Sequence, residues 1–270
     1  MAGGLAEQLW RARCDGGTLP RHAADGVRAT EDAYCVQRDA VQWGGLARAG
    51  WKVGATSEAA QTLLDVGGPA TAPLLAPLCF SSPTELAMFP GQNTSVESEF
   101  AFRFAQPLPA RDADYVLDEV LDAIGTLMPA IEVVACRFEG GFPDLGETRL
   151  IADMVANVAW VEGQSSGDWR GRDLSAHPVR LSRNGEHVVE GSGADVLGNP
   201  LNVLLWTANH LSSLGDGIAA GEVISTGTCT GVVAVEPGDV MTAGFGDLGQ
   251  VEVGFRAAGE SPNGVRAGRR

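Results

Sequence analysis

The sequence predicts an α+β fold in which helices surround a β-rich core. The N-terminal part alternates helix-like segments with glycine-rich breaks, the chain from residue 93 onward is rich in strand-forming residues, and one strongly periodic helix interrupts these strands near residue 200. With 270 residues, of which 44% are hydrophobic, the chain can bury a substantial core as one large domain or two closely joined ones. No internal repeat or long linker separates independent domains.

The N-terminal part predicts two helices, a strand and a loop. Helices are predicted over residues 4–14 and 30–48, the second beginning at Thr30, because a capping hydroxyl followed by acidic residues favours a helix start. Residues 50–56 predict a short strand bounded by glycine. The proline-rich passage 69–83 predicts a loop with little regular structure.

The part of the chain after residue 93 predicts strands separated by two helices. An alternating strand over 96–104 precedes a helix over 112–124 and a β-branched strand over 129–136. The clearest helix covers 199–215, since it begins with an Asn-Pro pair, follows the 3.6-residue apolar period and ends at a glycine. Three further strands, expected to form a β-meander with glycine corners, cover residues 222–231, 239–245 and 249–255.

The charge balance excludes several classes of partner. The 34 acidic and 19 basic residues give a formal charge of -15, which repels nucleic acid and anionic membrane surfaces. Any site for an acidic substrate must therefore supply its own local positive charge. The five cysteines form no CxxC pair and are expected to be reduced thiols. No secretory signal and no membrane-spanning stretch is visible, so a cytoplasmic protein is expected.

Three glutamates are candidate metal ligands. Glu97 and Glu99 project from one strand face about 7 Å apart, given a rise of ~3.3 Å per residue, and Glu132 lies in the middle of another apolar strand. Carboxylates on apolar strands repel one another unless a cation joins them, and three oxygen donors suit Mg²⁺ or Mn²⁺. The spacing also allows Glu97 and Glu99 to form the solvated face of an edge strand, and Glu132 to pair with an arginine.

Two other segments carry candidate polar groups. Lys52 lies between Trp51 and Val53, where partial desolvation would lower its pKa toward the range useful for proton transfer; the alternative is an exposed strand lysine. Gly227 and Thr228 offer a backbone N–H and a hydroxyl for a carboxylate, or simply form a tight β-turn. The four histidines show no ligand-like spacing, and no GxSxG, P-loop or GxGxxG motif is present.

Taken in order, several segments resemble the hydratase and decarboxylase branch of the fumarylacetoacetate hydrolase superfamily, which includes 2-oxopent-4-enoate hydratase and 4-oxalocrotonate decarboxylase. Each motif alone is weak, but their order and spacing are specific and span nearly the whole chain. The segments are AYCVQ (33–37), GWKVGATS (50–57), VESEFAF (96–102), IEVV (131–134), IADMVANVAWVEG (151–163), GNPLNVLLWTANHL (198–211), AGEVISTGTCTG (220–231) and the closing GDVMTAGFGDLGQVEVGF.

The resemblance implies a fold, its division and its assembly. It implies a mixed β-sandwich or roll core of the fumarylacetoacetate hydrolase type, with surrounding helices and a mainly helical N-terminal region. An N-terminal α/β region over residues 1–80 is expected to pack on a catalytic core over 81–257, and a tail over 258–270 is expected to be disordered. Assembly as a homo-oligomer, and association with a pathway partner enzyme, are also implied.

The resemblance further implies the chemistry. Glu97, Glu99 and Glu132 are implied to hold Mg²⁺ or Mn²⁺, and Lys52 is implied to be the catalytic lysine. Substrate binding is implied for Gly54, Asp153 and Thr228. The expected activity is that of a hydratase, which adds water to a 2-hydroxy-2,4-dienoate and gives a 4-hydroxy-2-oxo acid. The alternatives are a decarboxylase of a 4-oxalocrotonate-like 2-oxo acid and a catalytically diverged member of a biosynthetic pathway.

The sequence also departs from the family pattern. Residues 153–156 read DMVA where relatives commonly read ADNAS, residues 74–79 lack an acidic residue, and Ser95 stands where a basic residue is common. These changes suggest a more apolar substrate or a pathway outside aromatic degradation. Hydrolysis of a C–C bond is not expected, because His22 with Asp25 matches only weakly the pair that such relatives use for water activation.

Overall fold

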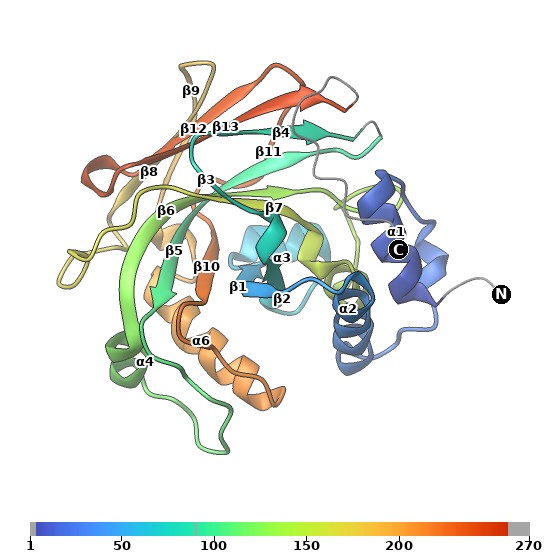
Figure 1. The fold of residues 1–270 in the computed structure, drawn as a ribbon, viewed down its shortest axis with the longest axis horizontal. Coiled ribbons are helices and arrows are strands. Elements are labelled where there is room, and N and C mark those ends of the chain that lie inside the picture. The colour runs from blue at the N-terminus through green and yellow to red at the C-terminus, as the bar shows by residue number, and fades with distance from the viewer. Residues whose placement is uncertain (1–3, 90, 259–270) are drawn as a thin grey trace.

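The computed structural model describes residues 4–89 and 91–258, and the larger of its two sheets forms the centre (Figure 1). The strands of this sheet are β1 (Arg48–Gly54), β2 (Ala70–Leu75), β3 (Cys79–Ser81), β5 (Ser95–Phe104), β6 (Ile124–Val134), β7 (Asn157–Glu162), β10 (Val223–Thr228) and β11 (Val233–Ala234). Their order is β2-β1-β10-β5-β6-β7-β3, with β11 beside β5. β1 runs parallel to β10 and β3 parallel to β7, whereas the other neighbours are antiparallel.

The smaller sheet packs on the larger one through apolar side chains. Its strands are β4 (Thr84–Met88), β8 (Pro178–Arg183), β9 (Glu186–Ser192), β12 (Val240–Gly244) and β13 (Gln250–Ala257), in the order β4-β13-β12-β8-β9. Phe100 and Ile131 of the larger sheet share one buried cluster with Leu181 and Val253 of the smaller sheet. Burial of this apolar surface holds the two layers together.

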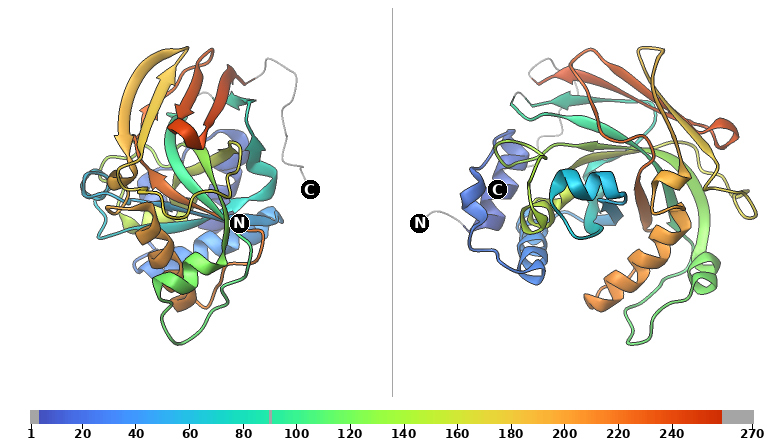
Figure 2. Two further views of the ribbon diagram at one scale, coloured as in Figure 1. Left: turned by 90° about the vertical axis from the view of Figure 1, so that its left-hand side faces the viewer. Right: turned by 180° about the vertical axis from the view of Figure 1, so that it is seen from behind.

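Six α-helices of the described residues surround the sheets. They are α1 (Leu5–Asp15), α2 (Thr30–Gly44), α3 (Glu58–Leu64), α4 (Leu117–Ala123), α5 (Glu147–Ala152) and α6 (Pro200–Ser213). Apolar residues of α1, α2 and α5 form a second cluster with β2, whereas α4 and α6 join the first cluster. Figure 2 shows α1 and α2 together at one end of the molecule and α4 and α6 at another side. None of these helices has the length and apolar character that crossing a bilayer requires.

The α+β prediction is confirmed, as are its most periodic elements. The strand predicted over 96–104 is β5, and the helix predicted over 199–215 is α6. Asn199 caps α6, since its side chain accepts a hydrogen bond from the Leu201 N–H at 2.9 Å. These two segments combined a consistent period with clear boundary residues, and both features come from the local sequence.

The loop predicted over 69–83 is wrong, because β2 and β3 occupy most of it. β2 is buried along its whole length and pairs with β1 from Gly54 opposite Ala70 to Gly50 opposite Leu74. Pro73 cannot donate a hydrogen bond, but β2 lies at the edge of the sheet, where a strand proline is tolerated. Tertiary pairing therefore overrides the local proline signal.

Several predicted boundaries are also wrong. The helix predicted over 30–48 begins after Ala29, without a side-chain cap from Thr30, and ends at Gly44, because Gly45 adopts a left-handed conformation with φ of 62°. The helix predicted over 112–124 shortens to α4. The predicted β-meander is wrong, because β12 and β13 are neighbours in the smaller sheet but β10 belongs to the larger sheet. The tail predicted to be disordered lies, after residue 258, outside the described residues.

Candidate metal centre

One face of the larger sheet carries polar side chains from five adjacent strands. Lys52 on β1 is the register partner of Ser225 on β10. Across the next strands, Glu97 on β5 is the partner of Glu132 on β6, which in turn is the partner of Trp160 on β7. Register partners project from the same face, so the strand order brings these residues together. Small and apolar residues of the same face surround them: Leu74, Ala101, Met128, Ala130 and Val223.

Three carboxylates converge on this face. One oxygen each of Glu97, Glu99 and Glu132 lies within 4.8 Å of the other two. Glu99 and Glu132 are fully buried, and Glu97 is partly buried. The residues expected from the sequence to share a cation are therefore close enough to do so, and neither glutamate of β5 lies on the solvated face of an edge strand.

Burial and neighbouring negative charge disfavour the charged forms of Glu97 and Glu99. Burial raises the pKa of Glu97 to about 7, although the nearby Lys52 opposes this shift. Burial raises the pKa of Glu99 well above its ordinary value, and the charges of Glu132 and Glu97 raise it further. A positive charge at the centre of the cluster would remove the free-energy cost of ionising these carboxyl groups.

Lys52 is the single lysine of the chain and is 1% exposed. Its Nζ lies 3.1 Å from Glu132 Oε2 and donates a hydrogen bond to the Val155 carbonyl at 3.0 Å. Burial lowers its pKa, but the carboxylates of Glu132, Glu97 and Glu99 raise the pKa more strongly, so the net shift is upward. The lowered pKa expected from the sequence is therefore wrong for this arrangement, because the glutamates outweigh desolvation.

The free oxygen atoms of the cluster fit a hard divalent cation. Oε2 of Glu99 accepts a hydrogen bond from Ser225, but Oε1 is buried without a hydrogen-bond partner among the described residues. Oε1 of Glu132 accepts from Asn157 Nδ2 at 2.9 Å, which leaves Oε2 facing Lys52. A buried carboxylate oxygen without a donor is costly, and an all-oxygen donor set is the one that Mg²⁺ and Mn²⁺ prefer.

Ser225, Trp160 and Asn157 support the glutamates, and the sequence analysis did not single them out. Trp160 Nε1 donates to Ser225 Oγ at 2.9 Å, and Ser225 in turn donates to Glu99. Asn157 donates to Glu132, as described above. All three lie in segments that carry the family resemblance, but their contacts depend on the order of the strands. Spacing along the chain contains no such signal.

A left-handed turn places a backbone carbonyl against the lysine. Met154, Val155 and Ala156 have φ values of 52°, 48° and 60°, a conformation that β-branched residues rarely adopt. The Val155 carbonyl accepts from Lys52, while its side chain lies against Gly54. A Cβ added at Gly54 would lie 2.5 Å from Val155 Cγ1 and 3.2 Å from Lys52 Nζ, so the close approach requires glycine here.

Asp153 and Thr228, two of the residues expected to bind substrate, use their side chains within the protein. Oδ1 of Asp153 lies 3.0 Å from Nε of Arg137, and Oδ2 accepts from the Arg137 backbone N–H at 2.8 Å. The Thr228 hydroxyl donates to the Gly231 carbonyl at 2.9 Å and accepts from the Thr230 N–H at 3.2 Å. Thr228 is the last residue of β10, opposite Glu99 in the register, and its hydroxyl contacts the bend that follows the strand. A role in substrate binding stays a prediction for both residues.

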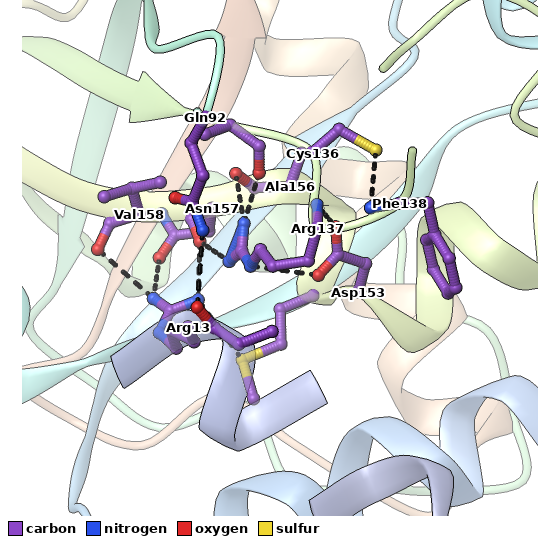
Figure 3. A network of polar contacts seen from close by, with 12 residues as sticks. Arg13, Gln92, Cys136, Arg137, Phe138, Asp153, Ala156, Asn157 and Val158 are labelled. Atoms are coloured by element: carbon purple, nitrogen blue, oxygen red, sulfur yellow. Dashed lines mark hydrogen bonds and ion pairs between the residues drawn. The ribbon is translucent and has the colours of Figure 1, made fainter. Parts of the chain in front are cut away.

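Two arginines lie next to the start of β7 (Figure 3). Arg137 is fully buried, pairs with Asp153 and donates to the Asn157 carbonyl. Arg13, from α1, donates to the same carbonyl at 2.5 Å and to Asn157 Oδ1 at 3.0 Å. This group of contacts joins the N-terminal helix, the left-handed turn and a residue that touches Glu132.

Comparisons with known proteins agree with this architecture. A family model described as fumarylacetoacetate (FAA) hydrolase C-terminal matches residues 56–256. The chain is 33% identical over 240 residues to the 2-keto-4-pentenoate hydratase of Paraburkholderia xenovorans (strain LB400), covering 88% of this chain and 87% of that protein. It is 30% identical over 255 residues to the 4-oxalocrotonate decarboxylase of Pseudomonas sp. (strain CF600), covering 93% and 95%.

Solved structures of a 4-oxalocrotonate decarboxylase are similar over nearly the whole chain. The 4-oxalocrotonate decarboxylase from Pseudomonas putida G7, in complex with magnesium and adipate, superposes with a TM-score of 0.82 at 28% sequence identity. The superposition covers 93% of this chain and 95% of that protein. At this coverage the similarity concerns the architecture as a whole and not one motif.

Proposed function

This chain belongs to the fumarylacetoacetate hydrolase family, and on that premise we propose that it is a divalent-metal-dependent lyase acting on a small 2-hydroxydienoate or 2-oxo acid. The reaction that we infer is the addition of water to a 2-hydroxy-2,4-dienoate, which gives a 4-hydroxy-2-oxo acid. The convergence of three carboxylates beside one buried ammonium group is the observation that carries this proposal. Its similarity to a 2-keto-4-pentenoate hydratase supports the choice of reaction.

Glu97, Glu99 and Glu132 are the residues that would hold Mg²⁺ or Mn²⁺. When bound, the ion would supply positive charge for an acidic substrate and stabilise negative charge that develops on the substrate oxygen. The magnesium complex of the similar decarboxylase supports a divalent cation. A cation at this site would also attract an acidic substrate locally, although the formal charge of the chain, -15, repels such a substrate overall.

Lys52 is positioned to transfer a proton. In the reaction that we infer, the substrate hydroxyl loses its proton and C5 gains one, with Lys52 Nζ assisting delivery, so that the dienol becomes a 2-oxo-3-enoate. Water then adds its oxygen at C4 and a proton at C3. The contacts of Nζ with Glu132 and the Val155 carbonyl fix its position, and burial excludes bulk water from it.

A decarboxylase is the second candidate, since the similar solved structure and one relative are both 4-oxalocrotonate decarboxylases. Decarboxylation and hydration both place negative charge on the substrate's 2-oxygen, so the same polar groups would serve either reaction. The products differ, and this difference separates the two candidates.

The test is to incubate the protein and Mg²⁺ with 2-hydroxypenta-2,4-dienoate and, separately, with 4-oxalocrotonate. Loss of dienol absorbance with formation of a 4-hydroxy-2-oxo acid supports the hydratase, whereas release of CO₂ supports the decarboxylase. Lys52→Met should lower turnover by about 10²- to 10⁴-fold, which is the usual contribution of a proton-transfer group. The variant protein should still bind the metal. Turnover of neither substrate, or full activity of the variant, would contradict the proposal.

A further inference from the structure

Arg13 connects the N-terminal helix to the polar face of the larger sheet. Its Nη2 donates to Asn157 Oδ1 at 3.0 Å and to the Val158 carbonyl at 3.2 Å, while Nη1 donates to the Asn157 carbonyl at 2.5 Å (Figure 3). Asn157 is 1% exposed, so its side-chain amide has no access to bulk water. The groups around this amide therefore decide which way it faces.

The guanidinium of Arg13 determines the orientation of the Asn157 amide. A guanidinium can only donate hydrogen bonds, so the amide oxygen must face Arg13 and the NH₂ group must face the other side. That other side holds Glu132, whose Oε1 accepts from Asn157 Nδ2 at 2.9 Å. If the amide were reversed, two donors would meet at Arg13 and two acceptors would meet at Glu132. Both contacts would be lost.

Asn157 in turn determines which oxygen of Glu132 accepts from the amide and which oxygen faces Lys52. With Oε1 engaged by Asn157, Oε2 faces Lys52 Nζ at 3.1 Å, and one oxygen of Glu132 lies within 4.8 Å of the oxygens of Glu97 and Glu99. Residues that hydrogen-bond to a metal ligand orient it, and their loss typically weakens metal binding by about 10- to 100-fold. Arg13 donates its hydrogen bonds to Asn157 and Val158, so these bonds would act on Glu132 through Asn157. Its positive charge also interacts directly with Glu132, but loss of that charge alone would favour cation binding, which is the opposite of the effect expected through Asn157.

We propose that Arg13 is a positioning residue for Glu132, acting through the side-chain amide of Asn157, and that docking of α1 and binding of the cation are thereby coupled. The inference rests on the proposed function, because it requires the three glutamates to bind a divalent ion. Coupling of this kind is reciprocal: the anchored helix favours cation binding, and the bound cation favours the anchored helix.

The competing explanation is that Arg13 only anchors α1. Its hydrogen bonds to the carbonyls of Asn157 and Val158 would serve that purpose without any effect on Glu132. The two explanations differ in whether the effect of Arg13 depends on the Asn157 side chain. A double-mutant cycle measures this dependence directly.

The experiment is to titrate Mn²⁺ into the metal-free 270-residue chain and to measure the Kd of Mn²⁺ by electron paramagnetic resonance. The variants are Arg13→Met, Asn157→Ala and the double variant, with Arg11→Met as the matched control, since Arg11 lies on the same helix and pairs with Glu7 at the surface. Arg13→Met and Asn157→Ala should each weaken binding about tenfold or more. The double variant should bind no more weakly than Asn157→Ala alone, and Arg11→Met should bind like the wild type.

Two results would overturn the inference. One is unchanged Mn²⁺ affinity in a folded Arg13→Met variant, and the other is an additive loss in the double variant. If Arg13→Met does not fold, hydrogen exchange of the wild type decides: Mn²⁺ should slow exchange of the amides of residues 9–15, and unchanged exchange contradicts the coupling. A wild-type chain that binds no Mn²⁺ would overturn the proposed function as well, whereas binding with no effect of Arg13→Met overturns this inference alone.

Discussion

At the scale of single residues, the glutamate cluster is costly to the metal-free protein. Glu99 is fully buried, and one of its oxygens has no hydrogen-bond partner within residues 4–89 and 91–258. Its pKa is raised first by burial and then by the charges of Glu132 and Glu97. Lys52 supplies only one positive charge to three carboxylates. Natural proteins accept such local costs where a functional site requires them.

Glu99→Gln should stabilise the metal-free protein while it weakens metal binding. Glutamine keeps the size of the side chain and can accept the hydrogen bond from Ser225, but it carries no charge to repel the other carboxylates. We expect the free energy of unfolding to rise by about 1–2 kcal/mol at pH 8 and Mn²⁺ affinity to fall at least about tenfold. Calorimetry with and without the metal measures both effects. Glu186→Gln, at an exposed position of β9, is the control and should change neither.

The charge state of Lys52 gives a second prediction at this scale. Because the neighbouring carboxylates raise its pKa above the ordinary lysine value, Lys52 should stay protonated in the metal-free protein at every pH below that value. Its raised pKa contributes stability that is fully present below the ordinary lysine pKa and is lost as the pH rises through the folded-state value. Protein labelled with ¹⁵N-lysine offers a single Nζ resonance to titrate, since the chain has one lysine.

Added Mg²⁺ should move the Lys52 titration to lower pH, because the ion offsets the glutamate charges. An Nζ resonance that titrates below the ordinary lysine value without metal would contradict the electrostatic description of the cluster. So would a titration that does not respond to saturating Mg²⁺.

At the scale of elements, the end of β1 and the left-handed turn are fitted to each other. Val155 takes a conformation that costs about 1 kcal/mol or more for a residue with a β-branched side chain. This conformation directs its carbonyl to Lys52, and Gly54 leaves room for its Cγ1. The strained backbone of Val155 therefore lies where its carbonyl positions the amine of Lys52.

Gly54→Ala should disturb this fit. The added Cβ would lie 2.5 Å from Val155 Cγ1, so overpacking should lower the free energy of unfolding by about 1–3 kcal/mol and reduce turnover. Val155→Ala removes the clashing methyl group, so the double variant should recover part of the stability that Gly54→Ala loses. Urea denaturation of the four proteins measures this. Equal stability of Gly54→Ala and the wild type would show that the two elements are not in close contact.

The sequence predicted those elements whose signals are local. β5 and α6 have a consistent period and clear boundaries, so they were predicted correctly. β2 was missed because its proline-rich segment becomes a strand only through pairing with β1. The two hairpin strands β8 and β9 were not predicted either. Much of β9 is exposed and shows no apolar alternation, and in β8 the alternation of exposed and buried residues is confined to residues 178–181.

At the scale of the whole molecule, the strand order assembles the site. Residues 52, 225, 99, 132 and 157 come from five neighbouring strands, although they lie far apart in the sequence. The resemblance indicated the three glutamates and the lysine as the metal ligands and the catalytic residue. It did not indicate Ser225, Asn157 or Arg13, since their roles depend on hydrogen bonds across the sheet and from α1. The register that creates these contacts is a property of the folded chain.

A metal site held by several strands would also link metal binding to global stability. A ligand that binds only the folded protein stabilises it by about 2.7 kcal/mol when its concentration is 100 times its Kd. Saturating Mg²⁺ or Mn²⁺ should accordingly raise the melting temperature of the wild type, and excess chelator should reverse this rise.

The convergence of three carboxylates on one divalent cation is tested most directly by titrating metal-free protein with Mn²⁺ and counting bound ions by electron paramagnetic resonance. We expect one tightly bound Mn²⁺ per chain. In Glu97→Gln and in Glu132→Gln, the affinity for Mn²⁺ should be lower by a factor of about ten or more. A wild-type chain without bound Mn²⁺, or binding that neither substitution weakens, would contradict the assignment of these side chains as the metal site.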